Sequence, residues 1–380
     1  MFKHLSIKSW FTGKTPPSWL HSIVVPISKP SQTNPRTYRP PTGQYPLPAM
    51  CANSLKKWSY VDSAFLEYHK ILSISQSGVR QRRKTTDHIL CLHDAIKKSL
   101  GNKHNVLSAF IGLEKAYDMV NKDLLLSKRL RYGISGRMFR FIHSFLSNRT
   151  FQVRLGSTLS LTKHLVENGT QGSVLSPILF TLMINDLPER ITSPAALYAD
   201  DFCFWECGSD ITFLNQLCQR SLFKVCNKCE ECGFKIFSTK SAAVLFTRKH
   251  DPVPISLILR DGTRLQMKIE HKCLGLTFQR NGSYLKHVQN VAAKCRARLN
   301  VISMLKGTSW GAGKRSLLTV YRSLVRSVIV YGMEAYFFTS PSLLKPLHKI
   351  QNDALRYVHC SAYITLAMKC LYSLGTSSCA

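Results

Sequence analysis

The stretch ALYADDFCFW, residues 196–205, places two adjacent carboxylates, Asp200 and Asp201, between two apolar runs. The apolar residues on both sides predict two buried strands, with the carboxylates at the turn of the hairpin between them. Neighbouring carboxylates repel each other and burial penalises their charged forms, so such a pair either takes up a proton or is held by a cation. The pattern is therefore typical of a divalent metal site. A solvated turn, in which Asp only ends a strand, is the alternative.

The composition points to a polyanionic partner. The 380 residues include 52 Lys and Arg against 21 Asp and Glu, for a formal net charge of +31, and 44% of residues are hydrophobic. This hydrophobic fraction suffices for a large core in more than one lobe, and the charge favours nucleic acid. Thirteen cysteines without an apolar secretory segment predict reduced thiols in the nucleus or cytoplasm. The most apolar stretch, residues 323–338, contains Arg326 and Glu334, so it predicts a core helix and no membrane span.

Three cysteines, Cys226, Cys229 and Cys232, recur at intervals of three residues. This spacing could begin a zinc site, but the second pair of Cys or His that closes a tetrahedral site is missing nearby. Ordinary buried cysteines on a helix are the alternative, which we favour.

The order of the predicted elements indicates a mixed α and β chain with a strand-rich middle and a basic, helical end. Residues 15–48 are rich in Pro, Ser and Thr and predict an extended segment. Periodicity and turn residues predict the other elements. Helices are predicted at 85–100, within 124–146, from Ser176, after residue 210, and beyond about 280. Strands are predicted at 105–113 and 242–248, and hairpins at 147–157 and 255–270.

Seven blocks of the chain resemble the reverse transcriptase of non-LTR retrotransposons. In chain order they are QSGVRQRRKTTDHIL, AFIGLEKAYDMV, GISGRMFRFIHSFLSNRTFQVRLG, NGTQGSVLSPILFTLMINDLP, LYADDFCFW, GFKIFSTKSAAVLFTR and KCLGLTF. The resemblance extends from about residue 16 to residue 358, and the blocks keep the order and intervals of the family. Within it, the metal interpretation of the carboxylate pair is favoured over the plain turn.

This resemblance implies an α+β, right-hand polymerase fold with fingers, a palm of antiparallel sheet plus helices, and a helical thumb. It implies a nucleotidyltransferase of a transposable element, acting on an RNA template, a DNA primer and dNTPs. The expected divisions follow from the blocks. They are 1–65, a degenerate N-terminal segment that is partly fingers; 66–105, fingers; 106–277, palm with a fingers insertion at about 119–170; 278–360, a thumb-like helical region; and 361–380, a tail.

The chemistry that the resemblance implies is two-metal nucleotidyl transfer with Mg²⁺ or Mn²⁺, for which carboxylate oxygens are suitable ligands. Asp200 and Asp201 would then hold the metal. Lys240 resembles a lysine that protonates pyrophosphate, and a solvated charge is the alternative for it.

Five further residues match positions that bind the incoming nucleotide. Tyr117 would exclude a ribose 2′ hydroxyl, although it could be a core tyrosine. Gln171 would help to position nucleotide and template, and Gly172 would permit close backbone approach. Arg80 and Arg83 would grip the triphosphate with their forked donors, unless they belong to a general basic face.

The chain departs from the family pattern at several positions. Gly112 stands where the family has the Asp shared by both ions, and Glu114 lies roughly 7 Å further along the strand, too far to replace it. Val79 replaces a Phe and Arg82 a Gly, and the segment before Gln171 is one residue short. The pattern is also lost over residues 40–63, as a shift of reading frame would cause, and after residue 359.

These departures leave two functions open. The first is an RNA-directed DNA polymerase with crippled chemistry, because losing the shared metal ligand costs a factor of ~10³ or more in rate. The second is a non-catalytic, basic nucleic-acid-binding remnant, whose affinity would fall steeply with salt.

Overall fold

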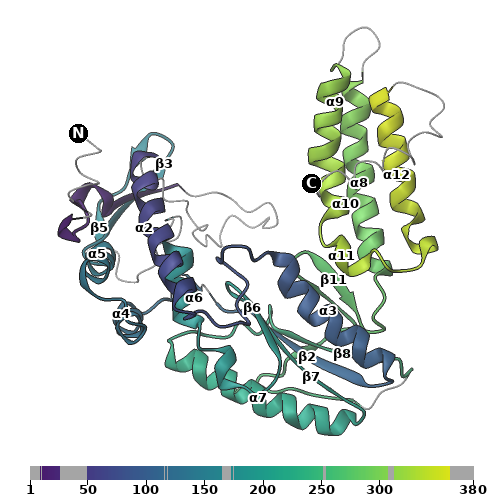
Figure 1. Cartoon of the computed structure of the whole chain (residues 1–380), viewed down its shortest axis with the longest axis horizontal. Coiled ribbons are helices and arrows are strands. Elements are labelled where there is room, and N and C mark those ends of the chain that lie inside the picture. Colours follow the sequence, from purple (N-terminus) through teal and green to yellow (C-terminus); the bar gives the residue numbers. More distant parts are fainter. Residues whose placement is uncertain are drawn as a thin grey trace. The chain divides into compact units, whose positions relative to one another are not determined.

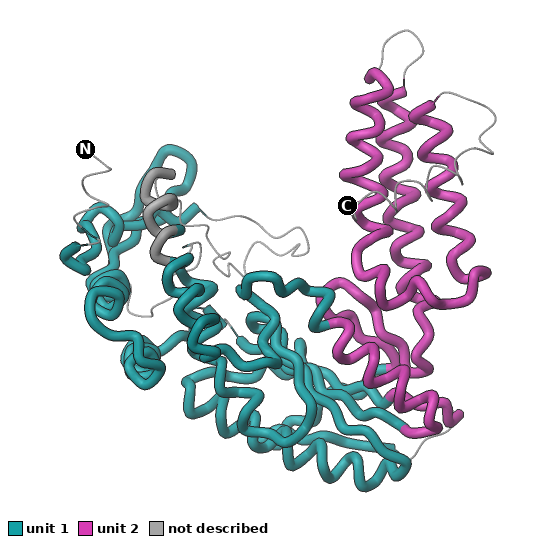
Figure 2. The backbone as a smooth tube through the Cα atoms, in the orientation of Figure 1, with its two compact units in different colours: residues 1–88, 105–245, 251–268 teal, residues 89–104, 246–250, 269–380 magenta. Residues whose placement is uncertain are grey.

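The computed structural model describes residues 9, 11–25, 49–114, 116–117, 119–164, 173, 175–250, 254–306 and 312–359. The chain divides into two compact units (Figure 2). Unit 1 comprises residues 1–88, 105–245 and 251–268, and unit 2 comprises residues 89–104, 246–250 and 269–380. Helices and sheets occur together in both, which confirms the predicted α+β class.

A five-stranded sheet carries the carboxylate hairpin in unit 1. Its strands, in spatial order, are β6 (Ala195–Tyr198), β7 (Asp201–Gly208), β2 (Asn105–Ile111), β8 (Ala242–Phe246, whose last residue belongs to unit 2) and β9 (Gln266–Met267). Strand β7 is antiparallel to both β6 and β2, and β9 is parallel to β8. Every residue of β2 is buried, as its apolar run predicts. Helix α7 (Ile211–Glu231) packs on β2 and β7 (Figure 1).

A second, smaller sheet and four helices complete unit 1. The sheet joins β1 (His21–Val24), β3 (Thr150–Leu155), β4 (Thr158–Leu159) and β5 (Lys163–His164), with β1 parallel to β3. The helices are α2 (Ala49–Tyr68), α4 (Lys122–Arg131), α5 (Gly136–Leu146) and α6 (Ser176–Ile184). Helix α6 begins at the predicted Ser176, followed by Pro177, whose fixed φ suits a first turn.

A buried ion pair joins α2 to α4. The Arg129 guanidinium donates to both carboxylate oxygens of Asp62, at 2.8 and 2.9 Å, and the two side chains are 0% and 1% exposed. Asp62 lies inside the segment 40–63 that the sequence marks as degenerate. The end of that segment is nevertheless integrated into unit 1.

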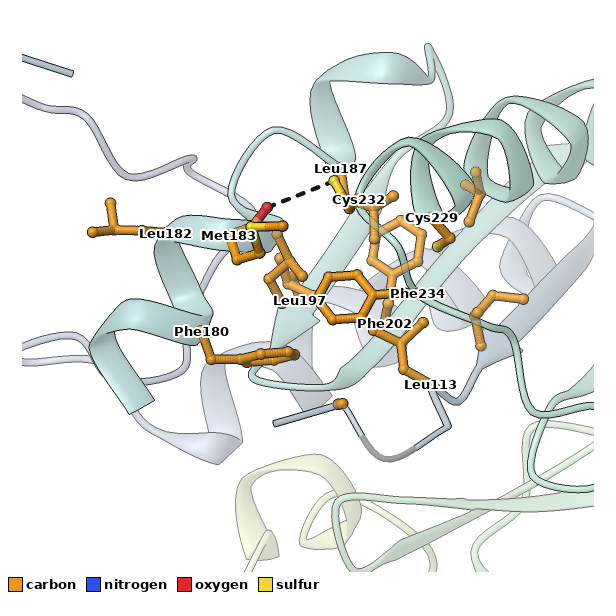
Figure 3. Packing of buried hydrophobic residues seen from close by; sticks show 14 of the residues in the cluster. Leu113, Phe180, Leu182, Met183, Leu187, Leu197, Phe202, Cys229, Cys232 and Phe234 are labelled. Carbon is orange, nitrogen blue, oxygen red and sulfur yellow. Dashed lines mark hydrogen bonds between the residues drawn. The ribbon is translucent and has the colours of Figure 1, made fainter. Parts of the chain in front are cut away.

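The core of unit 1 lies between the sheet, α6 and α7. Figure 3 shows Phe180, Phe202 and Phe234 packed with Leu113 and Leu197 beside the end of α7. The rings of Phe180 and Phe234 meet edge to face with centroids 5.8 Å apart, a favoured aromatic geometry.

Cysteines form part of this core. Cys226, Cys229 and Cys232 are all buried, and burial raises the pKa of each thiol. The Cys232 thiol lies 3.9 Å from the Met183 carbonyl oxygen, drawn as a dashed line in Figure 3. In the described part of the chain, no three His, Cys, Asp or Glu side chains are grouped to hold a metal ion. These thiols thus form part of the hydrophobic core of unit 1.

Unit 2 is built from a short hairpin and a group of helices. The hairpin pairs β10 (Glu270–Cys273) with β11 (Leu276–Gln279). Most of helix α3 (Thr85–Gly101) belongs to this unit, together with α8 (Leu285–Leu305), α9 (Lys314–Tyr321) and α12 (Pro341–His359), and α12 packs on both α8 and α9. Each helix of the described residues is too short or too polar to cross a bilayer.

Residues 323–338 do not form the single core helix that the sequence predicts. Helix α9 continues as a π-helical turn (Arg322–Arg326) and α10 (Ser327–Val330), and the chain then breaks before α11 (Met333–Tyr336). Gly332 adopts φ 67° at the break, and the Tyr331 hydroxyl donates to the Leu274 carbonyl oxygen. A left-handed glycine and a tertiary hydrogen bond thus override the apolar pattern.

The hairpin predicted at 255–270 is only partly formed. Its turn is present, with Gly262 at φ 82°, and Ile258 bridges Arg264. Beyond that single bridge the second run leaves its partner and enters the five-stranded sheet as β9 beside β8. The parallel pairing of β9 with β8 therefore replaces a longer antiparallel ladder between the two halves of the predicted hairpin.

Candidate active site

The two carboxylates lie at a tight turn between β6 and β7. The predicted hairpin is present. Tyr198 pairs with Asp201, so Ala199 and Asp200 form its two-residue loop and Asp201 is the first residue of β7. Ala199 has φ 52°, which a two-residue hairpin turn with a left-handed first residue requires and which glycine would supply without strain. Both carboxylates reach solvent.

Gly112 follows β2 directly and faces Asp201 across the sheet. Ile111 pairs with Phe202 in the antiparallel register, and one further step places Gly112 opposite Asp201. Opposite residues of such a ladder point to the same face, with Cβ positions about 5 Å apart. A carboxylate at residue 112 would therefore stand beside that of Asp201. Gly112 offers no side-chain oxygen there.

The backbone around Gly112 is held in place from the segment before β8. The Gly112 N–H donates to Ser241 Oγ at 3.0 Å, and the Phe237 N–H donates to the Gly112 carbonyl oxygen at 2.8 Å. A Cβ at residue 112 would lie 2.9 Å from Lys240 Cβ, closer than real Cβ atoms approach one another. Lys240 therefore occupies part of the space that a side chain at residue 112 needs.

Charge at the turn shifts the titration of Asp201. Loss of solvation by the surrounding protein raises the pKa of its carboxyl group, and the negative charge of Asp200 raises it further. The positive charge of Lys240 opposes this shift without cancelling it. His88, which the sequence did not single out, lies with Nε2 3.4 Å from Cys203 Sγ. Asp201 thus holds a proton more readily than an isolated aspartate does.

Tyr117 lies beside the same turn. Its ring packs against Phe180 with centroids 4.7 Å apart, and its side chain is half-buried. Burial raises the pKa of the Tyr117 hydroxyl, and the charge of Asp200 adds to the shift. The structure therefore brings Tyr117, Asp200, Asp201 and Lys240 together around residue 112.

The other predicted nucleotide-binding residues differ in their surroundings. Arg83 is exposed. Arg80 is instead engaged by Glu67 of α2 through two hydrogen bonds of 2.8 and 2.7 Å. Gln171 and Gly172 lie outside the described residues.

Two departures from the family sequence coincide with unusual backbone. Arg82, where the family has Gly, adopts φ 60°, and Val79 adopts φ 58°. Left-handed backbone is costly for residues with a Cβ, most of all when that carbon is branched. The local backbone thus retains a conformation that suits glycine at residue 82.

The donors at this site do not fit the two-metal arrangement that the family implies. Asp200 and Asp201 supply oxygen ligands suited to Mg²⁺ or Mn²⁺. The resemblance implies a third carboxylate where this chain has Gly112, and the described residues contain no group of three or more potential ligands. Asp200 and Asp201 would be the residues that hold a divalent ion here, and residue 112 would add no carboxylate to them.

Known proteins resemble this chain over most of its length. A family model described as reverse transcriptase (RNA-dependent DNA polymerase) matches residues 27–285. The probable RNA-directed DNA polymerase from transposon BS of Drosophila melanogaster is 24% identical over 365 residues, covering 92% of this chain and 39% of that protein. The RNA-directed DNA polymerase from the mobile element jockey of the same species is 24% identical over 362 residues, covering 91% and 38%. This chain spans about two fifths of the length of these relatives.

Solved structures of telomerase are also similar. The telomerase from Candida tropicalis in complex with a TWJ fragment of telomeric RNA aligns with 85% of this chain and 56% of its own, at 12% identity and a TM-score of 0.45.

Proposed function

Because this chain belongs to the reverse transcriptase family, among the enzymes of non-LTR retrotransposons, we propose that it is an RNA-directed DNA polymerase region with severely reduced activity. It binds an RNA template, a DNA primer and dNTPs, and its nucleotidyl transfer is slow because residue 112 lacks a carboxylate. The observation that carries this proposal is the register of β2 and β7, which sets Gly112 opposite Asp201. Lys240 Cβ closes the space beside it.

The remaining residues keep their roles in this proposal. Asp200 and Asp201 would hold a divalent ion without a third carboxylate at residue 112, and Lys240 would donate a proton to the leaving pyrophosphate. Tyr117 discriminates against a ribose 2′ hydroxyl, which its position beside Asp200 supports. Gln171, Gly172 and Arg83 contact the nucleotide.

A second candidate is a nucleic-acid-binding protein without catalysis. The formal net charge of +31 supports it, because phosphate contacts require only the basic surface and not the metal ligands. The two candidates share the binding of primer and template, and they differ only in whether nucleotide is added.

Primer extension on an RNA template with Mg²⁺, repeated with Mn²⁺, separates the two candidates. The unaltered chain is compared with Gly112→Asp, and Gly112→Asp combined with Asp201→Asn serves as the inactive control. We expect Gly112→Asp to extend at least ~10³-fold faster than the unaltered chain, as restoring several kcal/mol of metal stabilisation requires. Because a side chain at residue 112 overlaps Lys240 Cβ, thermal unfolding first shows that Gly112→Asp is folded. Equal rates for the unaltered chain and a folded Gly112→Asp would show that Gly112 is not a lesion.

Binding is measured in parallel, with a fluorescent primer–template at two salt concentrations. For six or more phosphate contacts, affinity falls by ~10³-fold or more between about 50 and 200 mM salt. Salt-sensitive binding with no extension by any variant favours the second candidate. Absence of binding at low salt would overturn both.

A further inference from the structure

A short segment outside the five-stranded sheet pairs with the edge of β6. The Ser77 N–H donates to the Leu197 carbonyl oxygen, and the Leu197 N–H donates to the Ser75 carbonyl oxygen, both at 2.8 Å. Gln76 and Leu197 form a parallel bridge. Leu197 lies three residues before Asp200, so this pairing fixes the strand that leads into the carboxylate turn.

The same segment reaches the turn itself at Gly78. A Cβ on Gly78 would lie 2.6 Å from the Ala199 backbone nitrogen and 3.2 Å from the Tyr198 carbonyl carbon, so no side chain fits there. The Gly78 N–H donates to Gln76 Oε1 at 2.7 Å. Gln76 is fully buried, and its Nε2 has no hydrogen-bond partner among the described residues. The backbone of Gly78 is thus packed directly against the turn.

Arg80 holds this segment from its other side. Arg80 Nε and Nη2 donate to the two carboxylate oxygens of Glu67, and Nη1 donates to the carbonyl oxygens of Ser73 at 2.9 Å and Gln76 at 3.3 Å. All three guanidinium nitrogens are therefore engaged, and the side chain is only 13% exposed. The hydrogen bond from Arg80 lowers the pKa of Glu67 despite the loss of solvation, so the pair stays charged. A forked pair of this kind has a well-defined geometry.

We propose that Arg80 is a positioning residue, which acts with Glu67 to hold residues 73–78 against the Ala199–Asp200 turn, and that it does not contact the triphosphate. The inference rests on the proposed function, since it concerns the same carboxylates. Arg83, exposed and three residues further on, remains the guanidinium that can meet a nucleotide. Arg80 therefore holds the turn that carries the carboxylates, and it does not bind the substrate.

The two roles of Arg80 give opposite results when Glu67 is changed. If Arg80 positions the turn, Glu67→Ala has the same effect as Arg80→Ala, and the double variant is no worse than either. If Arg80 binds triphosphate, Glu67→Ala releases it, so affinity for nucleotide is kept or raised while Arg80→Ala lowers it. Arg83→Ala is the matched control, and Glu67→Gln and Arg80→Lys are milder variants that retain one hydrogen bond each.

Hydrogen exchange of the peptide covering residues 196–203 is the first readout. We expect exchange there to rise at least ~10-fold in Glu67→Ala and Arg80→Ala, with little change in β2 or α7 and none anywhere in Arg83→Ala. Glu67→Gln and Arg80→Lys should be intermediate. Unchanged exchange at 196–203 in both alanine variants would overturn the proposal, as would an increase spread evenly over unit 1.

Nucleotide kinetics provide the second readout, in the Gly112→Asp background. A positioning role predicts that Arg80→Ala lowers kcat and leaves the KM for dNTP within about twofold, whereas Arg83→Ala raises KM. A rise in KM for Arg80→Ala, without a rise for Glu67→Ala, would overturn the proposal. If Gly112→Asp shows no polymerase activity, the proposed function fails, but the exchange experiment still decides the role of Arg80.

Discussion

A positive and a negative side chain pair directly at the contact between α2 and α4, whereas two negative side chains lie together at the turn between β6 and β7. At the first place, Arg129 and Asp62 meet in the interior with both carboxylate oxygens engaged. At the second, Asp201 faces the bare backbone of Gly112, and the positive charge of Lys240 only partly offsets the raised pKa of Asp201. The interactions that maintain the fold are thus separate from those that the chemistry needs.

The largest effect is expected from breaking the complete pair. Asp62→Ala leaves the Arg129 guanidinium buried without its counter-ion, and it should lower the free energy of unfolding by about 3–5 kcal/mol. Denaturant titration measures this. Asp353→Ala, which removes an exposed pair with Arg356, is the control and should cost at most about 0.5 kcal/mol. Equal losses in the two variants would contradict the comparison.

A second test concerns His287, a buried histidine in unit 2. Burial lowers the pKa of His287 from 6.5 to about 4, and the charges of Lys294 and Lys272 act in the same direction. Between these values the unfolded chain binds the proton and the folded chain does not, so stability falls as the pH drops from about 6.5 to 4. The loss amounts to at most ~3 kcal/mol.

This pH dependence is measured by denaturant titration at several pH values. His287→Gln should flatten the slope between pH 4 and 6.5, at some cost in stability at pH 7. A slope that is unchanged in the variant would show that His287 does not titrate as described.

The turn between β6 and β7 is tested by placing a side chain at residue 112. Gly112→Ala should destabilise the chain by about 1–3 kcal/mol, because its Cβ overlaps Lys240 Cβ. Lys240→Gly in the same chain should remove most of this penalty, whereas Lys240→Ala keeps the Cβ and should not. Gly101→Ala, with open space around it, is the control. A similar cost at residues 101 and 112 would contradict the steric account.

The smallest effect concerns the strained backbone beside the site. Arg82→Gly should stabilise the chain by about 0.5–1 kcal/mol, because glycine adopts φ 60° without a steric cost and this gain exceeds its greater freedom in the unfolded state. Arg83→Gly lacks that gain and should be neutral or destabilising. Thermal unfolding of the two variants, compared side by side, distinguishes them.

Local patterns predicted most of the elements around the site. The apolar run of β2, the hairpin at Asp200 and Asp201, and the start of α6 at Ser176 each depend on neighbouring residues, and the structure contains all three. The break at Gly332 could not be seen in this way. It depends on a hydrogen bond from Tyr331 to Leu274, which is distant in the sequence.

The sequence predicted the residues of the candidate site but not the ion pair that holds the neighbouring segment. Resemblance to the family indicated Tyr117, Lys240 and the carboxylates, and the structure brings these residues together. It gave no sign that Arg80 pairs with Glu67, since either residue alone is typical of a solvated surface. A partner thirteen residues away is decided by tertiary packing, which one sequence does not reveal.

The parallel pair β1 and β3 has a consequence for any shorter form of this chain. His21–Val24 covers one side of Thr150–Leu155, and the His21 ring hydrogen-bonds to the side chains of Thr150 and Gln152. A product that starts after residue 25 would leave the backbone of β3 open on that side. Open strand edges pair with other molecules, so such a fragment should aggregate during expression while the chain with its first strand stays dispersed.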